Sequence, residues 1–223
     1  MIVTQFLIYY SLLPMPQATL TQTIPLFPLG TTLFPGGVLP LKIFEVRYLD
    51  MVKKCFKEGS CFGIATIAAG SEVRMPNQAV QLLPIGTLAK IMHFDALQPA
   101  LYFIQCDGQS RFRILESTVQ SNGLVMATVE LLGDDSVMPI PAELTASATT
   151  LGKVIRALQE QGVSQEEMPF KQPFRLDECG WVANRWAELL PLTPLQKQQL
   201  LLQENPRLRL DLVNDFLDQE GVR

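Results

Sequence analysis

Apolar and polar positions repeat with two different periods along the chain, and the change of period divides it. Residues 44–58 carry apolar side chains on one helical face, beginning with Phe44, and Gly59 follows as a natural stop. Short apolar, β-branched runs then follow one another closely. They lie at residues 61–67, 86–94, 101–106, 110–115 and 124–132. This spacing predicts an antiparallel barrel or a curled sheet, with Asp107-Gly108 as a hairpin turn.

From residue 139 onward only helical spacing remains. Helices are predicted at residues 141–161 and 178–190, then from Thr193-Pro194 and from Asn205-Pro206. Asp177 is the expected cap of the second of these. The face of the last helix that is expected to pack on the core carries Leu208, Leu212 and Phe216. A β-rich part followed by a helical part predicts an α+β fold.

Residues 24–48 place apolar side chains between prolines and glycines. Each proline fixes φ and removes a backbone donor, so neither a helix nor a central strand is expected here. The prolines are Pro25, Pro28, Pro35 and Pro40. We predict short extended pieces broken by turns, most sharply at Pro35-Gly36-Gly37. A run this apolar must lie against a core.

Composition and charge narrow the possible functions. The chain has 223 residues, 48% of them hydrophobic, a net charge of −4 and a pI of about 5.1. An acidic chain without a basic patch makes nucleic acid an unlikely partner. The cysteines show no C-x₂-C spacing, so we expect reduced, mostly buried thiols and a cytoplasmic protein. They are Cys55, Cys61, Cys106 and Cys179.

Residues 1–23 form an apolar leader without lysine or arginine. Its apolar stretch is shorter than the ~20 residues that span a bilayer, and it lacks the charged start of a signal peptide. We interpret it as an over-extended start, with Met15 as an alternative first residue. A segment that packs on the domain and a membrane anchor are the alternatives.

Catalytic motifs are sparse. The chain contains no G-x-x-x-x-G-K-[ST] loop, and His93 is its single histidine. We therefore expect no enzyme activity, no metal site and no cofactor, and His93 is interpreted as structural. Asp134-Asp135 is interpreted as a solvated turn, because one acidic pair lacks the oxygens that calcium needs.

Two further patterns have a structural and a functional interpretation. Arg111 and Arg113 alternate with Phe112, which predicts a solvated strand face or, alternatively, an RNA-binding face. Trp181 and Trp186 lie five residues apart on a predicted helix, which favours core packing over a peptide-binding role.

Several segments of the sequence resemble those of one known family. IPLFPL, LFPGG, LPL, IFE-x-RY, GTLAKI, RFRI and WVANRWAELLPL are similar to the Lon substrate-binding domain, the amino-terminal module of Lon proteases. The resemblance covers residues 24–216 and is closest to small bacterial proteins that carry this module alone. It implies a leader (1–23), a PUA-like β pseudo-barrel (24–135) and a small helical bundle (139–223). Its structural motif residues are Pro28, Pro35, Gly36, Gly37, Phe44, Glu45, Arg47 and Tyr48.

The resemblance implies a non-catalytic module that recognises unfolded or exposed apolar protein segments, away from membranes. The candidate contact residues are Phe34, Leu39, Leu41, Phe94 and Tyr102. Phe34 has a core interpretation as an alternative. Glu45 and Arg47 could clamp a ligand, but a local role is favoured, with Arg47 bonding carbonyls of the proline-rich loop. The alternative function is a PUA-like RNA-binding module; the oligomeric state stays open.

Overall fold

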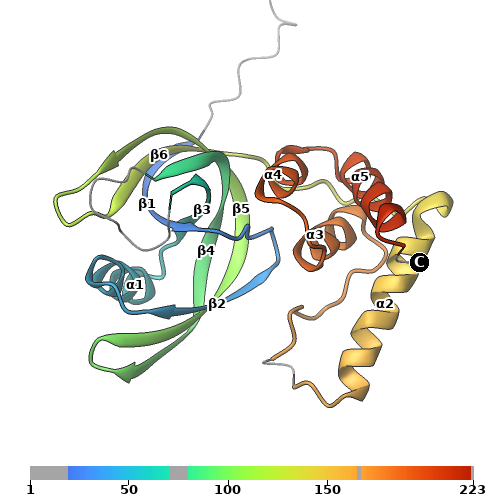
Figure 1. Cartoon of the computed structure of the whole chain (residues 1–223), viewed down its shortest axis with the longest axis horizontal. Coiled ribbons are helices and arrows are strands. Elements are labelled where there is room, and N and C mark those ends of the chain that lie inside the picture. The colour runs from blue at the N-terminus through green and yellow to red at the C-terminus, as the bar shows by residue number, and fades with distance from the viewer. Residues whose placement is uncertain (1–19, 71–79, 165–166, 222–223) are drawn as a thin grey trace, which may run out of the picture.

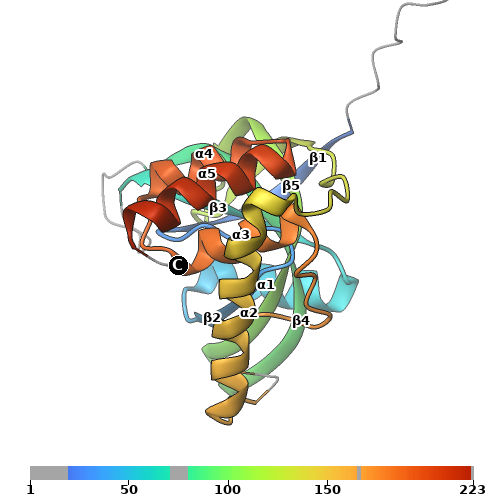
Figure 2. The same ribbon diagram turned by 90° about the vertical axis from the view of Figure 1, so that its right-hand side faces the viewer.

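The computed structural model describes residues 20–70, 80–164 and 167–221. Figure 1 shows two parts side by side: a barrel of strands with one short helix, and a group of helices. We call residues Thr21–Leu131 the β half and residues 142–219 the helical half. Figure 2, turned by 90°, shows the helices covering one side of the barrel. This arrangement confirms the predicted α+β class.

One six-stranded sheet forms the barrel, in the order β2-β5-β4-β3-β1-β6, and an additional β5–β6 pairing closes it. Pairing is antiparallel except between β1 and β3. Because β2 pairs only with β5, it lies outside the closed ring. The strands are β1 (Thr21–Leu29), β2 (Val38–Ile43), β3 (Phe62–Ala69), β4 (Gln81–Gln98), β5 (Leu101–Val119) and β6 (Val125–Leu131).

The prediction that the proline-rich segment contains no central strand is wrong. β1 lies between β3 and β6, begins at Thr21 and includes Pro25 and Pro28. The two ladders barely overlap, since β6 pairs with residues 21–26 and β3 with residues 26–29. Each proline is therefore paired on one side only, and its missing N–H costs no ladder hydrogen bond on the other side.

The predicted hairpin turn at Asp107-Gly108 is also wrong. Both residues lie inside β5, which joins the two strands expected at 101–106 and 110–115. Glycine is needed at 108 for a different reason: a Cβ there would lie 2.2 Å from the carbonyl oxygen of Phe34. The glycine permits close approach of the 33–34 backbone. The turn between β4 and β5 falls at Pro99-Ala100 instead.

Helix α1 (Val46–Glu58) confirms the helix predicted from its apolar spacing, apart from its first turn. Glu45 is the N-cap, so Phe44 lies before the helix and is 58% exposed rather than part of the buried face. Tyr48, Met51 and Cys55 form that face, with Tyr48 stacked on Phe27 at 4.1 Å between ring centroids. α1 thereby covers one end of the barrel (Figure 1).

The helical half contains η2 (Ala142–Leu144), α2 (Thr145–Glu160), α3 (Cys179–Leu189), α4 (Pro194–Leu202) and α5 (Pro206–Gln219). Thr193 and Gln196 form the predicted capping box, and Asn205 caps α5. Glu178, not Asp177, is the N-cap of α3.

The core face predicted for α5 is wrong. Leu208 and Leu212 are 49% and 40% exposed, and Phe216 is only partly buried. The buried face carries Arg209, Leu210, Val213 and Leu217. The apolar pattern alone could not find it, because a charged residue, Arg209, is as completely buried as Leu210 and Val213.

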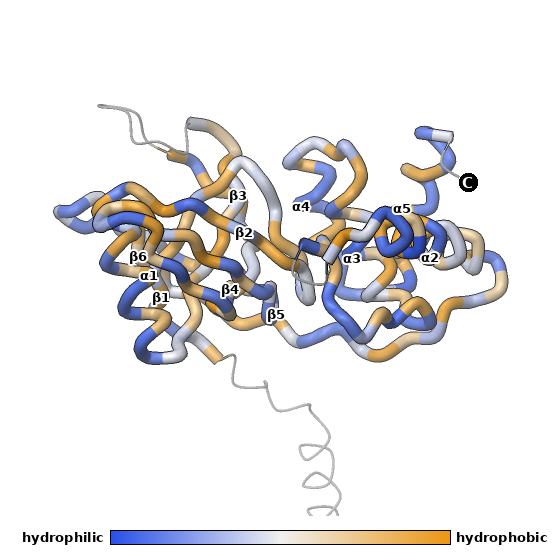
Figure 3. Tube along the Cα trace, turned by 90° about the horizontal axis from the view of Figure 1, so that it is seen from below, coloured by the Kyte–Doolittle hydropathy of each residue, from blue (hydrophilic) through white to orange (hydrophobic). Residues whose placement is uncertain are grey.

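The hydrophobic core is divided in the same way as the fold. Two clusters fill the barrel, and a third fills the helical half. Phe34 and Ile85 belong to the helical cluster although they come from the β half, so the two halves share part of one core. Trp181 and Trp186 are both buried in that cluster, as predicted. Figure 3 shows the two halves from below, adjoining each other.

All four cysteines are free, and all but Cys61 are buried, which confirms the prediction of mostly buried thiols. Among the described residues, no helix has the length and apolarity that crossing a bilayer requires. The leader proposed for residues 1–23 lies almost wholly outside the described residues.

Candidate functional site

The Pro35-Gly36-Gly37 motif receives a side chain from the helical half. Arg185 of α3 donates hydrogen bonds to the carbonyl oxygens of Pro35 (3.0 Å) and Gly36 (2.6 Å). Its Nε also lies 2.8 Å from Oε2 of Glu188, and its side chain is fully buried. Gly37 must be small, because a Cβ there would lie 2.0 Å from Oε1 of Glu188. The motif thus anchors the helical half to the barrel.

Phe34, a predicted contact residue, precedes this motif and is fully buried among the helices. Tyr102 is only 3% exposed. Leu39, Leu41 and Phe94 are partly buried and pack against the barrel core. The structure therefore separates these five residues: Phe34 belongs to the junction, and the other four line the inner face around β2 and the β4–β5 hairpin.

Arg111 is not on a solvated strand face, which corrects that prediction. It is 3% exposed and donates to the carbonyl oxygens of Leu201 (2.9 Å) and Gln203 (3.2 Å) at the end of α4. Burial and the nearby Arg209 lower the pKa of Arg111, while Asp135 opposes them. Arg113 is exposed and lies 3.6 Å from Glu130. The alternation that suggested an RNA face therefore offers one accessible arginine rather than two.

Asp135 is a partner of the buried arginines rather than part of a solvated turn, which corrects a further prediction. Its Oδ1 accepts from Arg209 at 2.9 Å and from Arg111 at 3.3 Å. Asp134 is exposed and accepts from Ser110 at 2.7 Å. Sequence reasoning missed Arg185 and Arg209; the available signal was an arginine at position 185 inside the mostly apolar run WVANRWAELL.

The Glu45–Arg47 pair has local contacts. The two side chains form an ion pair at 2.8 Å, and Arg47 lies over the ring of Tyr48. Arg47 donates to the carbonyl oxygen of Gly123, between β5 and β6, and not to the proline-rich loop as expected. His93 is exposed on β4 with its ring 6.3 Å from that of Phe103.

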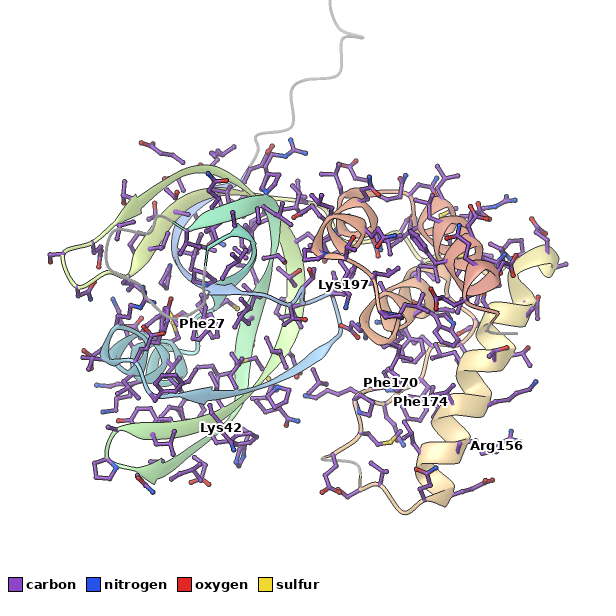
Figure 4. All side chains as sticks on the ribbon, in the orientation of Figure 1. Phe27, Lys42, Arg156, Phe170, Phe174 and Lys197 are labelled. Atoms are coloured by element: carbon purple, nitrogen blue, oxygen red, sulfur yellow. The ribbon has the colours of Figure 1, made fainter. Side chains whose placement is uncertain are left out.

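A cleft lies on the other side of the junction, between the barrel and the segment that joins α2 to α3. Val38 of β2 and Gln105 of β5 line one side, residues from 163–164 and 167–174 line the other, and its volume is about 380 Å³. Figure 4 shows Phe170 and Phe174 between the barrel and α2. The lining residues are Val38, Gln105, Gln159, Val163, Met168, Phe170, Lys171, Gln172 and Phe174.

The lining of this cleft is mostly apolar and uncharged. Among the described residues that line it, Lys171 alone is charged, and it is paired with Asp107 at 2.6 Å. Met168 and Phe170 are buried and form its floor, whereas Val38, Val163 and Phe174 remain partly exposed. Such a surface gains free energy when it is covered by apolar groups, at about 25 cal/mol per Å² of buried apolar area.

A larger hollow of about 800 Å³ lies at the mouth of the barrel, between α1 and strands β1 and β6. Its apolar lining includes Ile24, Met51, Leu88 and Leu124, and Arg47, Asp50, Lys54 and Glu58 add charges. The walls contributed by β1 are already paired with β3 and β6. This hollow therefore offers side-chain contacts, whereas the cleft at β2 also offers a strand edge.

Comparison with known families matches almost all of the described chain. Residues 23–219 match the family described as the ATP-dependent protease La (LON) substrate-binding domain. The chain belongs to this family. The resemblance noted in the sequence is thereby confirmed, and the matched region is the substrate-binding domain of Lon, not its protease domain.

Relatives and solved structures agree with this assignment. Lon protease of Anaeromyxobacter dehalogenans is 26% identical over 198 residues, which are 88% of this chain and 23% of that protein. The crystal structure of a Lon N-terminal domain protein from Xanthomonas campestris is 32% identical, with a TM-score of 0.69, covering 87% of this chain and 98% of that one. The N-terminal domain of Mycobacterium avium complex Lon protease shares the fold at 16% identity, with a TM-score of 0.56 over 88% of this chain and 98% of that one.

Proposed function

We propose that this Lon substrate-binding domain captures unfolded or exposed apolar segments of other proteins, and that the cleft between the start of β2 and residues 168–174 is the site of capture. The observation that carries the proposal is the combination of partly exposed apolar side chains with an outer strand in one cleft. Backbone contacts along a strand are independent of sequence, and apolar walls tolerate many side chains.

The cleft suits weak and tolerant binding. Covering Val38, Val163 and Phe174 supplies a modest hydrophobic gain, from which the costs of association and of ordering the partner are subtracted. Micromolar affinity for a short apolar segment is the expected scale. A substrate-capturing domain benefits from such affinity, because a captured segment must also be released.

The test is fluorescence anisotropy with a labelled, uncharged apolar peptide and the Phe174→Ala variant. Phe174 is partly exposed, so its truncation is expected to weaken binding about 5- to 30-fold, as loss of about 1–2 kcal/mol of apolar contact predicts. The midpoint of urea unfolding identifies any loss of fold.

Phe56→Ala is the matched control. Phe56 is 47% exposed on α1 and stacks on Phe94 at 5.1 Å, one of the contact residues predicted from sequence. Unchanged binding by this variant supports the cleft. Loss of binding by Phe56→Ala with retention by Phe174→Ala would move the site to the α1 surface. A labelled RNA strand in the same assay should bind no better than weakly at ~150 mM salt.

A further inference from the structure

Strand β2 has an outer edge that the sheet does not use. Among residues 20–70, 80–164 and 167–221, no strand pairs with this edge between Val38 and Ile43, while β5 pairs with the inner edge along the whole length. An open edge presents a row of backbone donors and acceptors that another extended chain can pair with. Its first residue, Val38, lines the cleft.

The domain itself begins to pair with this edge and then stops. Gly37, just before β2, forms an antiparallel bridge with Phe170 of the opposite wall. Continuing that register would place Pro169 opposite Val38. Proline has no N–H to donate, so the bridge cannot extend along β2 into a ladder. The bridge shows that an antiparallel strand fits here, and Pro169 leaves the rest of the edge open.

The contacts of Gly37 indicate which residues of β2 direct their backbone groups outward. The carbonyl oxygen of Gly37 accepts from the N–H of Gly108 on β5 at 2.9 Å, so this carbonyl faces inward, while the N–H of Gly37 donates to the carbonyl oxygen of Phe34 at 3.0 Å. With the two-residue period of a strand, Leu39, Leu41 and Ile43 also face β5, whereas Val38, Pro40 and Lys42 face outward. Pro40 therefore sits where its missing N–H costs the sheet nothing.

We propose that substrates of this domain are bound as an added antiparallel strand on the outer edge of β2, with alternate side chains against the apolar wall at Phe174. This inference rests on the proposed function and specifies its substrate class: extended segments that can donate N–H groups at every second residue. Acceptors on the domain are the carbonyls of Val38, Pro40 and Lys42, and Lys42 also supplies a donor.

Backbone N-methylation provides the decisive probe. Two versions of an alternating Val-Thr octapeptide carry N-methyl groups on either the valines or the threonines, and both are compared with the unmodified peptide by anisotropy. Only one set of N–H groups can face β2 while the valines face the apolar wall. We expect one methylated peptide to lose at least 10-fold in affinity and the other to stay within about 3-fold.

Equal losses for both methylated peptides, or no loss for either, would overturn strand addition while leaving apolar capture in the cleft intact. Absence of binding by the unmodified peptide would instead remove the proposed function itself. The two failures are therefore distinguishable.

A pair of variants tests the same edge from the side of the protein. Lys42→Pro removes one of the two outward N–H groups of β2, the other being that of Val38, without touching the ladder to β5, whereas Lys42→Ala keeps it. Binding of the unmodified peptide should fall several-fold for Lys42→Pro and stay near wild type for Lys42→Ala, with urea midpoints confirming that both fold. Equal binding by the two variants contradicts a role for this donor.

Discussion

The two halves of the molecule meet in two very different ways. On one side of the contact, the buried arginines Arg111, Arg185 and Arg209 tie backbone carbonyls and carboxylates of both halves together. On the other side, an outer strand faces partly exposed apolar side chains across an open cleft. The first contact is closed and charged, beside the apolar core that Phe34 and Ile85 share with the helices, and the second is open and mostly apolar.

The difference indicates a division of labour within one interface. Buried charges are costly to desolvate, so they hold a structure only where every partner is in place. Such a contact fixes the orientation of the helical half relative to the barrel. A fixed orientation keeps the cleft open, since two freely moving halves would close over its apolar walls. The contact made by the buried arginines therefore allows the apolar surface of the cleft to remain exposed.

The largest expected effect on the free energy of unfolding comes from breaking the contact made by the buried arginines. Arg185→Ala leaves the carbonyls of Pro35 and Gly36 and the carboxylate of Glu188 without their buried partner. Removal of one member of a buried pair typically costs about 3–5 kcal/mol. We expect a loss of this size in the free energy of unfolding, measured by urea denaturation.

Arg113→Ala is the control for that experiment, because Arg113 pairs with Glu130 at the surface and its side chain is 45% exposed. Exposed ion pairs contribute about 0–1 kcal/mol, so its urea midpoint should hardly move. Similar losses for the two variants would show that the junction is no stronger than an ordinary surface contact.

This contrast also explains which parts of the molecule could be predicted from sequence. Helix α1 and the capping box of α4 could be predicted because apolar spacing and local hydrogen bonds determine them. The strand containing Pro25 and Pro28 was not, because proline excludes a central strand only where both sides are paired at the same residue. No local sequence pattern indicates that the two ladders of β1 barely overlap.

The candidate site was even harder to predict from the sequence than the fold. Arg111 was assigned to the surface because arginines usually lie there; its burial depends on carbonyls of Leu201 and Gln203, some ninety residues away in sequence. The cleft depends on how residues 168–174 pass the start of β2, which is again a long-range outcome. Local pattern identifies apolar residues, but the contacts that bury or expose them are set by the whole fold.

A smaller effect on stability is expected from titrating Glu188, which pairs with the buried Arg185. Burial raises the pKa of Glu188 from 4.5 to about 7, with Arg185 opposing the shift. Between these two pH values the folded chain keeps a proton that the unfolded chain releases, so stability falls as pH rises through this window and is constant above it. The expected decrease between pH 5 and pH 8 is on the order of 1–3 kcal/mol.

Urea midpoints at several pH values measure this decrease, and Glu188→Gln should flatten it because an amide does not titrate. Glu143→Gln serves as the control, since Glu143 pairs with Arg207 at the surface and is 59% exposed. Parallel pH profiles for wild type and Glu188→Gln would contradict the assignment of the titration to Glu188.

The smallest effect on stability, and the one that separates the two sides most finely, is expected at Pro40. Pro40→Ala adds an N–H to the outward edge of β2, where the sheet has no partner for it, so the free energy of unfolding should change by less than about 1 kcal/mol. An added strand can use the new donor, and one more hydrogen bond of about 0.5–1.5 kcal/mol should tighten binding of the unmodified peptide about 2- to 10-fold.

Pro84→Ala changes another exposed strand proline, on β4 and away from this edge, and should leave binding unchanged. Equal affinities for Pro40→Ala and wild type would mean that the edge is not where the substrate pairs. Removing this proline also unblocks an exposed edge, and sedimentation velocity should then detect more self-association than in wild type, because two such edges can pair with each other.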